Sequence, residues 1–348
     1  GGLGDDALSG GDSADVISGD AGDDTISGGA EADTLKGGLG DDTIDGGTGI
    51  DTIDGESGND TLTGDAGADI ISGGLGADTI DGGADGDTID GGDGADILKG
   101  GTGVDTITGG AGNDQLSAGD TINATEGGDS LSGGTGNDTY FLDDSWELAT
   151  YTEAAGEGQD TLDFSAVSNT ADTLTYTFST TTLAIAQATA AKSLTALANF
   201  ENIVTTNGTN AFVFADDATG THHITGATGT TTIELADDIT AYTITERSAG
   251  TLIISHATSG LYIIAENVST LTSYDKLTDP MNIATLTDTK NGGGKWNGDF
   301  KTAVTVSTDA EATLLKDSFD NGVDVGNAQK AISQVIEQFA LYALDNYD

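Results

Sequence analysis

The stretch GGTGIDTIDG, residues 46–55, is one copy of a nine-residue unit that repeats along the first part of the chain. In this copy an aspartate, Asp51, is followed two places later by an aliphatic residue, Ile53. The aspartates of the repeat fall nine residues apart, at Asp6, Asp15, Asp24, Asp33, Asp42, Asp51, Asp60, Asp69, Asp78, Asp87, Asp96, Asp105 and Asp114. The aliphatic residues that follow them are Leu8, Ile17, Ile26, Leu35, Ile44, Ile53, Leu62, Ile71, Ile80, Ile89, Leu98, Ile107 and Leu116. A fixed period of this kind predicts a stack of similar structural units.

The unit does not fit an α-helix, because a nine-residue period matches neither a 3.6-residue nor a 3.5-residue pattern. We expect three residues around each aliphatic, such as Thr43-Ile44-Asp45, to form a short strand with the aliphatic pointing inward. The residues before it, such as 37–42, would turn the chain, and their glycines suit positive φ angles and close backbone approach. Two units would then make one coil with two strands, and successive coils would bury their aliphatic residues on one another.

Stacking would place the aspartates of every second unit in a column, about 4.7–4.9 Å apart, which is the spacing of neighbouring strands. Two like charges about 5 Å apart repel by roughly 0.8 kcal/mol in water and by about 3 kcal/mol at an effective dielectric constant near 20. Calcium can neutralise such a column because it takes about 6 to 8 oxygen ligands, from carboxylates and backbone carbonyls alike. The glycine turns expose carbonyls, so each unit is predicted to supply half of a calcium site and the next coil the other half.

The unit reads G-G-x-G-x-D-x-U-x, with U a large aliphatic residue, and in this form it resembles the RTX family of calcium-binding nonapeptide repeats from residue 1 to about residue 141. The resemblance implies an all-β fold, a right-handed parallel β-roll, that binds several Ca²⁺ ions. It also implies export from a Gram-negative bacterium by a type I secretion apparatus, and hence a secreted, extracellular or cell-surface location. The metal ligands expected are the repeat aspartates above, continued by Asp129 and Asp138, and turn glycines exemplified by Gly38, Gly40, Gly47, Gly49, Gly74 and Gly76.

Several copies depart from the unit. Other residues replace its third glycine at Ser13, Glu31 and Asp85, and its second glycine at Asp20, Glu56 and Asp65. We expect these turns to bind calcium less well or to use the extra carboxylate. After Asp114 the period slips, since Asp120 follows after six residues before Asp129 and Asp138 resume the nine-residue step. This slip predicts a bulged coil over residues 117–126.

The remaining chain is predicted to form three segments after the roll of residues 1–141. Residues 142–165 form a cap, in which a weak repeat copy places Asp160 before Leu162. Residues 166–290 are rich in Thr, Ala, Val and Ile, and segments such as TLTYTF and TLIISH predict a β domain. Degenerate repeats persist there, because Asn210 with Phe212 keeps the relative places of the aspartate and the aliphatic, while the metal sites are expected to lapse.

Residues 291–348 are predicted to be a C-terminal tail with amphipathic helices. A capping box precedes residues 310–319, and apolar residues recur at helical spacing over residues 327–347. By resemblance to RTX proteins, this tail would hold the uncleaved secretion signal. A helix that only packs on the end of the sheet is the alternative interpretation, and the two do not exclude each other.

Composition restricts the partners. The 348 residues include 59 acidic and 10 basic side chains, for a net charge of −49, which makes nucleic acid and anionic membranes unsuitable partners and opposes compaction without cations. The chain has no cysteine, which excludes disulfides and thiolate metal sites. No stretch approaches about 18 apolar residues, so we expect no membrane span. Because the chain begins Gly1-Gly2 rather than with Met, we expect it to be the C-terminal part of a longer protein.

Other interpretations of the motifs fit less well. An acidic, Gly-rich tract can be a disordered tail, and we expect this state without calcium, but such a tail has no reason to keep an aliphatic at every ninth place. No segment has the twelve-residue pattern of an EF-hand. His222 and His223 are adjacent, so on a strand they would face opposite sides, and surface or packing roles are favoured over a transition-metal site. NGGGKWNGD lacks the spacing of a P-loop and predicts a turn.

Motifs for catalysis are missing from the sequence, which contains neither H-E-x-x-H nor G-x-S-x-G, so we predict that this chain is not an enzyme. Two functional classes remain. The first is an extracellular structural protein, an S-layer subunit, adhesin or filament, with self-association or a cell-surface glycan as its partner. The second is the secretion and folding module of a toxin or hydrolase whose catalytic domain lies upstream.

Overall fold

The computed structural model describes residues 1–119, 128–144, 146, 149–153, 158–167, 173–178, 183–187, 192–197, 199–206, 209–214, 221–226, 230–235, 242–246, 251–256, 259, 261–266, 268–274, 283–287 and 304–306. The chain divides into two compact units, residues 1–167 with 197–200 and residues 168–196 with 201–348. Regular structure in the described part consists almost entirely of β-strands, which confirms the predicted all-β class.

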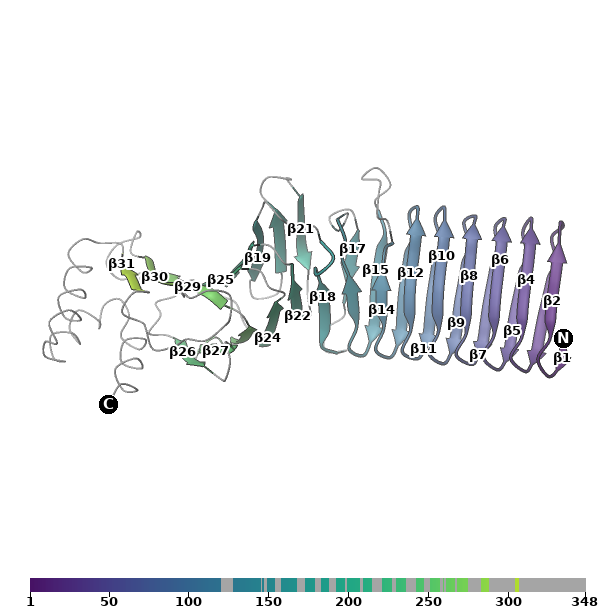
Figure 1. The fold of residues 1–348 in the computed structure, drawn as a ribbon, viewed down its shortest axis with the longest axis horizontal. Helices are drawn as coiled ribbons and strands as arrows, with labels where there is room; N and C mark the ends of the chain where they lie inside the picture. Colours follow the sequence, from purple (N-terminus) through teal and green to yellow (C-terminus); the bar gives the residue numbers. More distant parts are fainter. Residues whose placement is uncertain are drawn as a thin grey trace, which may run out of the picture. The chain divides into compact units, whose positions relative to one another are not determined.

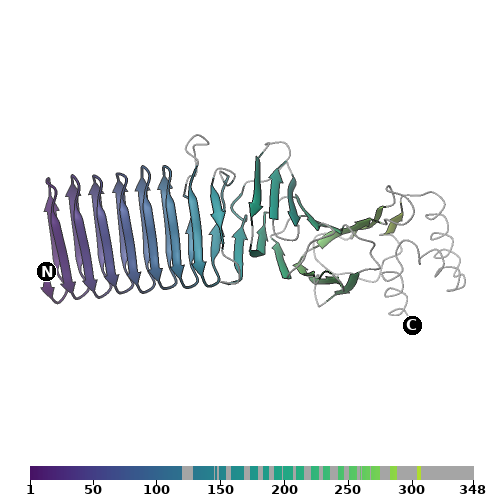
Figure 2. The same cartoon turned by 180° about the vertical axis from the view of Figure 1, so that it is seen from behind.

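The first unit is a parallel β-roll in which the chain passes alternately through two sheets, seen from opposite sides in Figures 1 and 2. One sheet contains the odd-numbered strands β1 (Gly2–Leu3), β3 (Val16–Ala21), β5 (Thr34–Leu39), β7 (Thr52–Ser57), β9 (Ile70–Leu75), β11 (Thr88–Asp93), β13 (Thr106–Ala111), β15 (Ser130–Thr135) and β17 (Thr150–Thr152). The other contains β2 (Ala7–Gly11), β4 (Thr25–Ala30), β6 (Thr43–Thr48), β8 (Thr61–Ala66), β10 (Thr79–Ala84), β12 (Ile97–Thr102), β14 (Gln115–Ser117), β16 (Thr139–Phe141) and β18 (Asp160–Asp163).

Each coil of the roll contains two repeats, as predicted, because strands pair with a register of 18 residues. Ile44 pairs with Leu62 in one sheet, and Ile53 pairs with Ile71 in the other. The aliphatic residue of every repeat from Ile26 to Leu116 is at most 1% exposed. Burial of one such side chain contributes about 1.5–3 kcal/mol, and these columns form the core of the roll.

The strands are longer than the sequence pattern predicted. Strand β6 covers six residues and includes the glycine pair, so the prediction of three-residue strands and six-residue turns was wrong. The register passes from Asp45–Thr63 directly to Gly47–Asp65, so the ladder omits one residue on each strand. Gly47 has a φ of 99°, a conformation that L side chains rarely adopt, and it lets the strand continue past this irregularity.

The register slip after Asp114 is absorbed without loss of strand pairing. Strand β13 pairs with β15 with Thr106 opposite Ser130, a step of 24 residues instead of 18. The six extra residues therefore lie between β14 and β15, where residues 120–127 fall outside the described part of the chain. The register thus places six extra residues in one coil, and the predicted bulge over residues 117–126 lies mostly outside the described residues.

Residues 142–165, predicted as a cap, continue the two sheets by one more coil. Strand β17 pairs with β15, with Leu131 opposite Tyr151, and β18 pairs with β16, with Tyr140 opposite Leu162. Aromatic residues replace the aliphatic core here. The rings of Trp146 and Phe164 meet edge to face with centroids 5.8 Å apart, an arrangement that buries large apolar area.

The second unit holds mixed sheets. One has the order β21 (Lys192–Leu197), β20 (Leu183–Gln187), β19 (Thr173–Phe178), β23 (Thr209–Phe214), β25 (Thr230–Leu235), β29 (Val268–Tyr274), β30 (Ile283–Thr287) and β31 (Val304–Val306). A second set has the order β22 (Phe200–Thr205), β24 (Thr221–Gly226), β28 (Tyr262–Glu266), β27 (Thr251–His256) and β26 (Tyr242–Glu246). Strands β23 and β25 are parallel and place Phe212 opposite Ile233, as the degenerate repeats require.

The segment predicted as a helical tail contains a β-strand. Strand β31 lies within residues 291–348 and pairs antiparallel with β30. The two predicted helices, over residues 310–319 and 327–347, lie outside the described residues.

Acidic residues occupy several positions where the repeat normally has glycine. Asp20, Glu31, Glu56, Asp65 and Asp85 all have φ between 68° and 76°, in the left-handed region. A side chain in this conformation costs about 1–2 kcal/mol relative to the right-handed one. The substituted copies therefore keep the backbone path of the glycine and store strain there.

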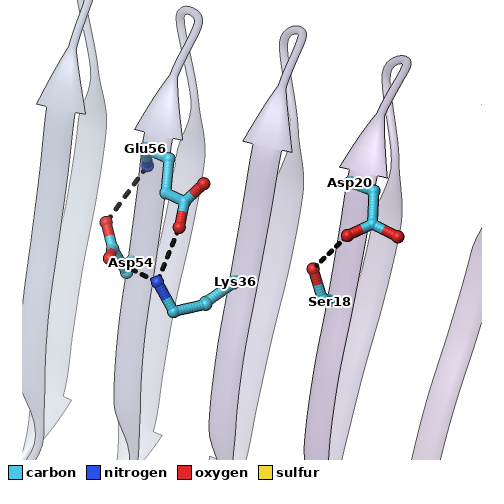
Figure 3. A network of polar contacts seen from close by, with 5 residues as sticks. All are labelled: Ser18, Asp20, Lys36, Asp54 and Glu56. Carbon is cyan, nitrogen blue, oxygen red and sulfur yellow. Dashed lines mark hydrogen bonds and ion pairs between the residues drawn. The ribbon is translucent and has the colours of Figure 1, made fainter. Parts of the chain in front are cut away.

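One substituted copy is compensated by an ion pair. Figure 3 shows Asp54 and Glu56 of β7 converging on Lys36 of β5, with its Nζ 3.2 Å from Asp54 and 2.6 Å from Glu56. All three side chains are partly exposed, so the pairs contribute at most about 1 kcal/mol each. Glu56 thus recovers part of the strain of its backbone.

Replacing Asp65 with glycine is expected to stabilise the folded roll by about 1 kcal/mol, because it removes a left-handed side chain. It also removes a carboxylate whose proximity raises the pKa of Asp45, after the larger effect of burial. Chemical denaturation at saturating calcium measures the change. The matched control is Gly83→Ala at the same place in the next coil, where the new Cβ would collide with the Asp65 carbonyl oxygen and should destabilise the roll. Equal stability of the two variants would contradict the strain argument.

Candidate metal centres

The repeat aspartates form two hydrogen-bonded columns, one at each edge of the roll. Each lies in the turn after a strand, and its Oδ1 accepts the backbone N–H of the aspartate one coil earlier. Asp24 N–H donates to Asp42 Oδ1 at 2.7 Å, and Asp33 N–H donates to Asp51 Oδ1 at 2.7 Å. The pattern survives the insertion, since Asp105 N–H donates to Asp129 Oδ1 at 2.9 Å. One carboxylate oxygen of each repeat aspartate from Asp24 onward is thus satisfied by the backbone.

The second carboxylate oxygen is buried without a hydrogen-bond partner. This holds for Oδ2 of Asp15, Asp24, Asp33, Asp42, Asp51, Asp60, Asp69, Asp78, Asp87, Asp96, Asp114 and Asp138. From Asp24 onward these residues are at most 2% exposed. A buried carboxylate oxygen without a partner is costly, and a column of them points to a missing cation.

Within the repeats before Asp138, the unpaired oxygen lies near a carbonyl from the neighbouring coil. A Cβ placed on Gly46 would lie 2.7 Å from Asp51 Oδ2, 3.0 Å from the Gly64 carbonyl oxygen and 3.2 Å from Ile53 Cδ1. In the other column, a Cβ on Gly91 would lie 2.5 Å from Asp96 Oδ2 and 2.6 Å from the Gly109 carbonyl oxygen. Glycine therefore keeps open a space between a carboxylate of one coil and a carbonyl of the next.

This donor set fits calcium. Carboxylate and carbonyl oxygens are the hard ligands that Ca²⁺ prefers, and its flexible coordination accepts a mixture of both. The aspartate Oδ2 atoms and the carbonyls of the first glycines, such as Gly64 and Gly109, would hold the ions. When bound, calcium supplies the positive charge that the columns lack.

Sequence reasoning missed the first glycine of each repeat as a ligand. The glycines that were predicted, Gly38, Gly40, Gly47, Gly49, Gly74 and Gly76, all have φ between 99° and 143°, and their role as ligands stays a prediction. A signal was present in the sequence, because the first glycine is retained in every copy from Gly1 to Gly109, whereas the second and third are replaced by acids in several copies. A position that stays glycine through thirteen successive copies faces something that must stay accessible.

The predicted aspartates are not all equivalent. Asp6 has the same arrangement with the Gly19 carbonyl but lies in the first coil and is only half-buried. Asp129 is 2% exposed, and the register places Ala118 at the first-glycine position before it, with its carbonyl oxygen beside Gly100. The regular arrangement of buried aspartate and glycine carbonyl is therefore found in the middle coils.

Comparison with known families identifies the repeats. The model of the RTX calcium-binding nonapeptide repeat matches residues 1–35, 19–53, 36–71, 54–89, 90–120 and 116–144. Residues 1–144 are RTX calcium-binding repeats. This part of the chain is thus of RTX calcium-binding type, and multiple Ca²⁺ ions are its cofactors. No curated protein matches the chain. Among the described residues, no helix is long and apolar enough to cross a membrane.

Burial, with repulsion between carboxylates, raises the pKa values of RTX aspartates in the middle of the array above their ordinary range. The pKa rises to about 7 for Asp60 and Asp87 and to about 6 for Asp69, chiefly because burial disfavours the charged carboxylate. Neighbouring aspartates in the column raise it further, and the backbone N–H bonds lower it. Lys36 and Lys99 are the only basic side chains within residues 1–167, and both lie on the outer surface, where they pair with exposed acids. Calcium, not lysine, must therefore neutralise the columns.

Acidification is expected to fold the calcium-free roll. Between pH 4 and pH 7 the folded aspartates with pKa values of about 6 to 7 hold protons that the unfolded chain, with values near 4, has released. Stability without calcium should therefore increase as pH falls through this window and decrease as pH rises. Far-UV circular dichroism in chelator at pH 7.5 and pH 5.0 measures this, with β signal expected only at pH 5.0. Less β structure at the lower pH would contradict it.

The histidines show no sign of a metal site. The His222 ring packs against the rings of Phe178 and Phe214, with centroids 4.5 and 5.8 Å away, which matches the predicted packing role. His256 Nδ1 contacts Ser259 Oγ at 2.8 Å and also accepts the Ser259 backbone N–H at 3.1 Å, so this pair closes a turn. Among the described residues, one group of three side chains could hold a metal ion, and it consists of carboxylates without a histidine.

Proposed function

We propose that this chain is the calcium-dependent part of a secreted bacterial surface protein, of the S-layer, adhesin or filament type. It crosses a type I secretion channel unfolded and folds outside the cell when calcium fills the roll. The observation that carries the proposal is the pair of columns in which buried, unpaired Asp Oδ2 atoms face glycine carbonyls of the next coil.

The columns support a coupling between calcium and folding. An unfolded chain contains no complete site, because the carboxylate and the carbonyl come from different coils. Calcium therefore binds the folded state and stabilises it. Extracellular calcium modules have dissociation constants of about 10⁻⁴–10⁻³ M. Sites in this range stay empty where calcium is scarce and fill outside the cell.

A structural role rather than catalysis is favoured by what the described residues offer. His222 packs on aromatic rings and His256 closes a turn, and the sequence lacks the motifs of RTX-bearing metalloproteases and lipases. The roll also exposes large apolar side chains along its outer surface, including Leu39, Ile50 and Leu75 at 55–63% exposure. Exposed apolar residues of this size are suited to contacts with other molecules.

A calcium titration of the full chain tests the proposal. We expect a sigmoidal gain of far-UV β signal with calcium and none with magnesium, because Mg²⁺ demands a small octahedral site and retains its water. An equal response to both ions, or no response, would contradict the calcium-driven fold. If calcium folds the chain, light scattering of the folded protein then reports whether it assembles into larger particles, as a lattice or filament protein should.

A substitution in the middle of the array should cost more than one at its start. Asp60→Ala is expected to raise the calcium midpoint several-fold, because Asp60 is buried between two coils that share its ions, whereas Asp6→Ala should shift the midpoint little. The control Asp90→Ala removes an exposed carboxylate from the outer surface and should leave the midpoint unchanged. Equal midpoints for the Asp60 and Asp6 variants would contradict ion sharing between coils.

A further inference from the structure

The last coil of the roll ends its column with a side chain instead of a backbone carbonyl. Beside Gly91, the space kept open by glycine is bounded by Asp96 Oδ2 and by the carbonyl of Gly109 from the next coil. Beside Gly133, the corresponding space is bounded by Asp138 Oδ2 and by Glu153 Oε1. A glutamate carboxylate therefore stands where every earlier coil of this column supplies a glycine carbonyl.

The register explains how Glu153 reaches this place. Strand β17 pairs with β15 with Thr150 opposite Ser130 and Thr152 opposite Ser132, so Glu153 falls opposite Gly133. It thus occupies the first-glycine position of the next coil, which is glycine in every earlier coil of this column. A side chain at this position points into the roll, and here it points back to the aspartate of the preceding coil.

Three carboxylates meet at this point. Asp138, Glu153 and Asp160 each offer an oxygen, and these oxygens lie within 4.8 Å of one another. The three residues are 0%, 6% and 2% exposed, respectively. Asp138 Oδ2 and Glu153 Oε2 are buried without a hydrogen-bond partner, while Asp160 Oδ1 accepts the Asp138 N–H at 3.0 Å. Two unpaired buried oxygens in a triply acidic cluster require a cation.

The surrounding residues hold Glu153 in position. The Tyr140 hydroxyl contacts Glu153 Oε1 and the Gly133 N–H, and it donates to the Thr152 carbonyl at 3.0 Å. The Tyr140 ring is buried and meets the ring of Tyr151 edge to face, with centroids 5.9 Å apart. A preorganised carboxylate of this kind loses little conformational entropy when it binds an ion.

We propose that Asp138, Glu153 and Asp160 form a calcium site distinct from the repeat sites, which closes the end of the roll and is the tightest site of the array. The proposal rests on the proposed function, since it assigns one more site to the same calcium-binding column. Its affinity follows from charge, because calcium affinity increases with the number of carboxylates and the rigidity of the site. The repeat sites described above combine aspartate with neutral carbonyls, whereas this site has three carboxylates. It therefore keeps its ion at calcium concentrations that empty the repeats.

Glu153→Gln in the full chain tests the site, with Glu56→Gln as the matched control on the outer surface. Equilibrium dialysis with radioactive calcium measures the ions bound by each protein from low to saturating concentration. We expect wild type and Glu56→Gln to show one tight ion followed by a weaker, cooperative class. Glu153→Gln should lose the tight ion or bind it about tenfold or more weakly, while the weaker class remains. A tight class in Glu153→Gln identical to that of wild type would overturn the proposal.

Two further measurements separate this outcome from other failures. If wild type bound no calcium at all, the proposed function would fail, and the site with it. If Glu153→Gln did not reach the wild-type circular dichroism signal at saturating calcium, Asp160→Asn would replace it.

Terbium luminescence excited through tyrosine provides a local signal, because Tyr140 contacts Glu153. The signal at the lowest terbium concentrations should be lost in either acidic-site variant and kept in Glu56→Gln, and an unchanged signal in both variants would also overturn the proposal.

Discussion

The structure of the roll depends on carboxylate oxygens that are buried in columns and have no protein partner. The backbone satisfies Oδ1 of the repeat aspartates from Asp24 onward, but in the middle coils Oδ2 faces a glycine carbonyl, which is itself an acceptor. Two acceptors cannot hydrogen-bond to each other, so the arrangement is unfavourable until a proton or a cation enters it. The core cannot compensate for this by itself, because each nine-residue copy buries only one aliphatic side chain. Calcium is therefore part of the fold and not an addition to it.

The three glycines of the repeat have different physical roles, and these explain which of them can vary. The second and third adopt positive φ, and Asp20, Glu31 and Glu56 show that an acidic residue can take such a place with strain. The first glycine leaves room for the ion, and a Cβ there would meet both a carboxylate and a carbonyl oxygen. Strain of about 1–2 kcal/mol can be offset elsewhere in a long array, but a blocked site cannot.

The period of the sequence was sufficient to predict the parallel coils, the core and the aspartate columns, because Asp51 and Ile53 recur at intervals that allow no other regular structure. The length of the strands could not be predicted in the same way. Gly46 and Gly47 carry no apolar pattern, and their pairing depends on a backbone irregularity at φ 99° that only the ladder reveals. Glu153 was missed because it lies outside the nine-residue pattern, and its equivalence to Gly133 follows from a 20-residue step in strand pairing.

The two ends of the roll differ in a way that bears on how the array responds to calcium. In the first coil Asp6 is half-buried, whereas the repeat aspartates from Asp24 onward are almost fully buried. At the other end, Tyr140, Trp146 and Phe164 are almost fully buried, and aromatic packing replaces the aliphatic column. Aromatic burial does not depend on calcium, so this end retains stabilising contacts when the ions are lost. Because stability in stacked repeats is passed between neighbouring coils, the roll should lose structure from the Asp6 end first as calcium falls.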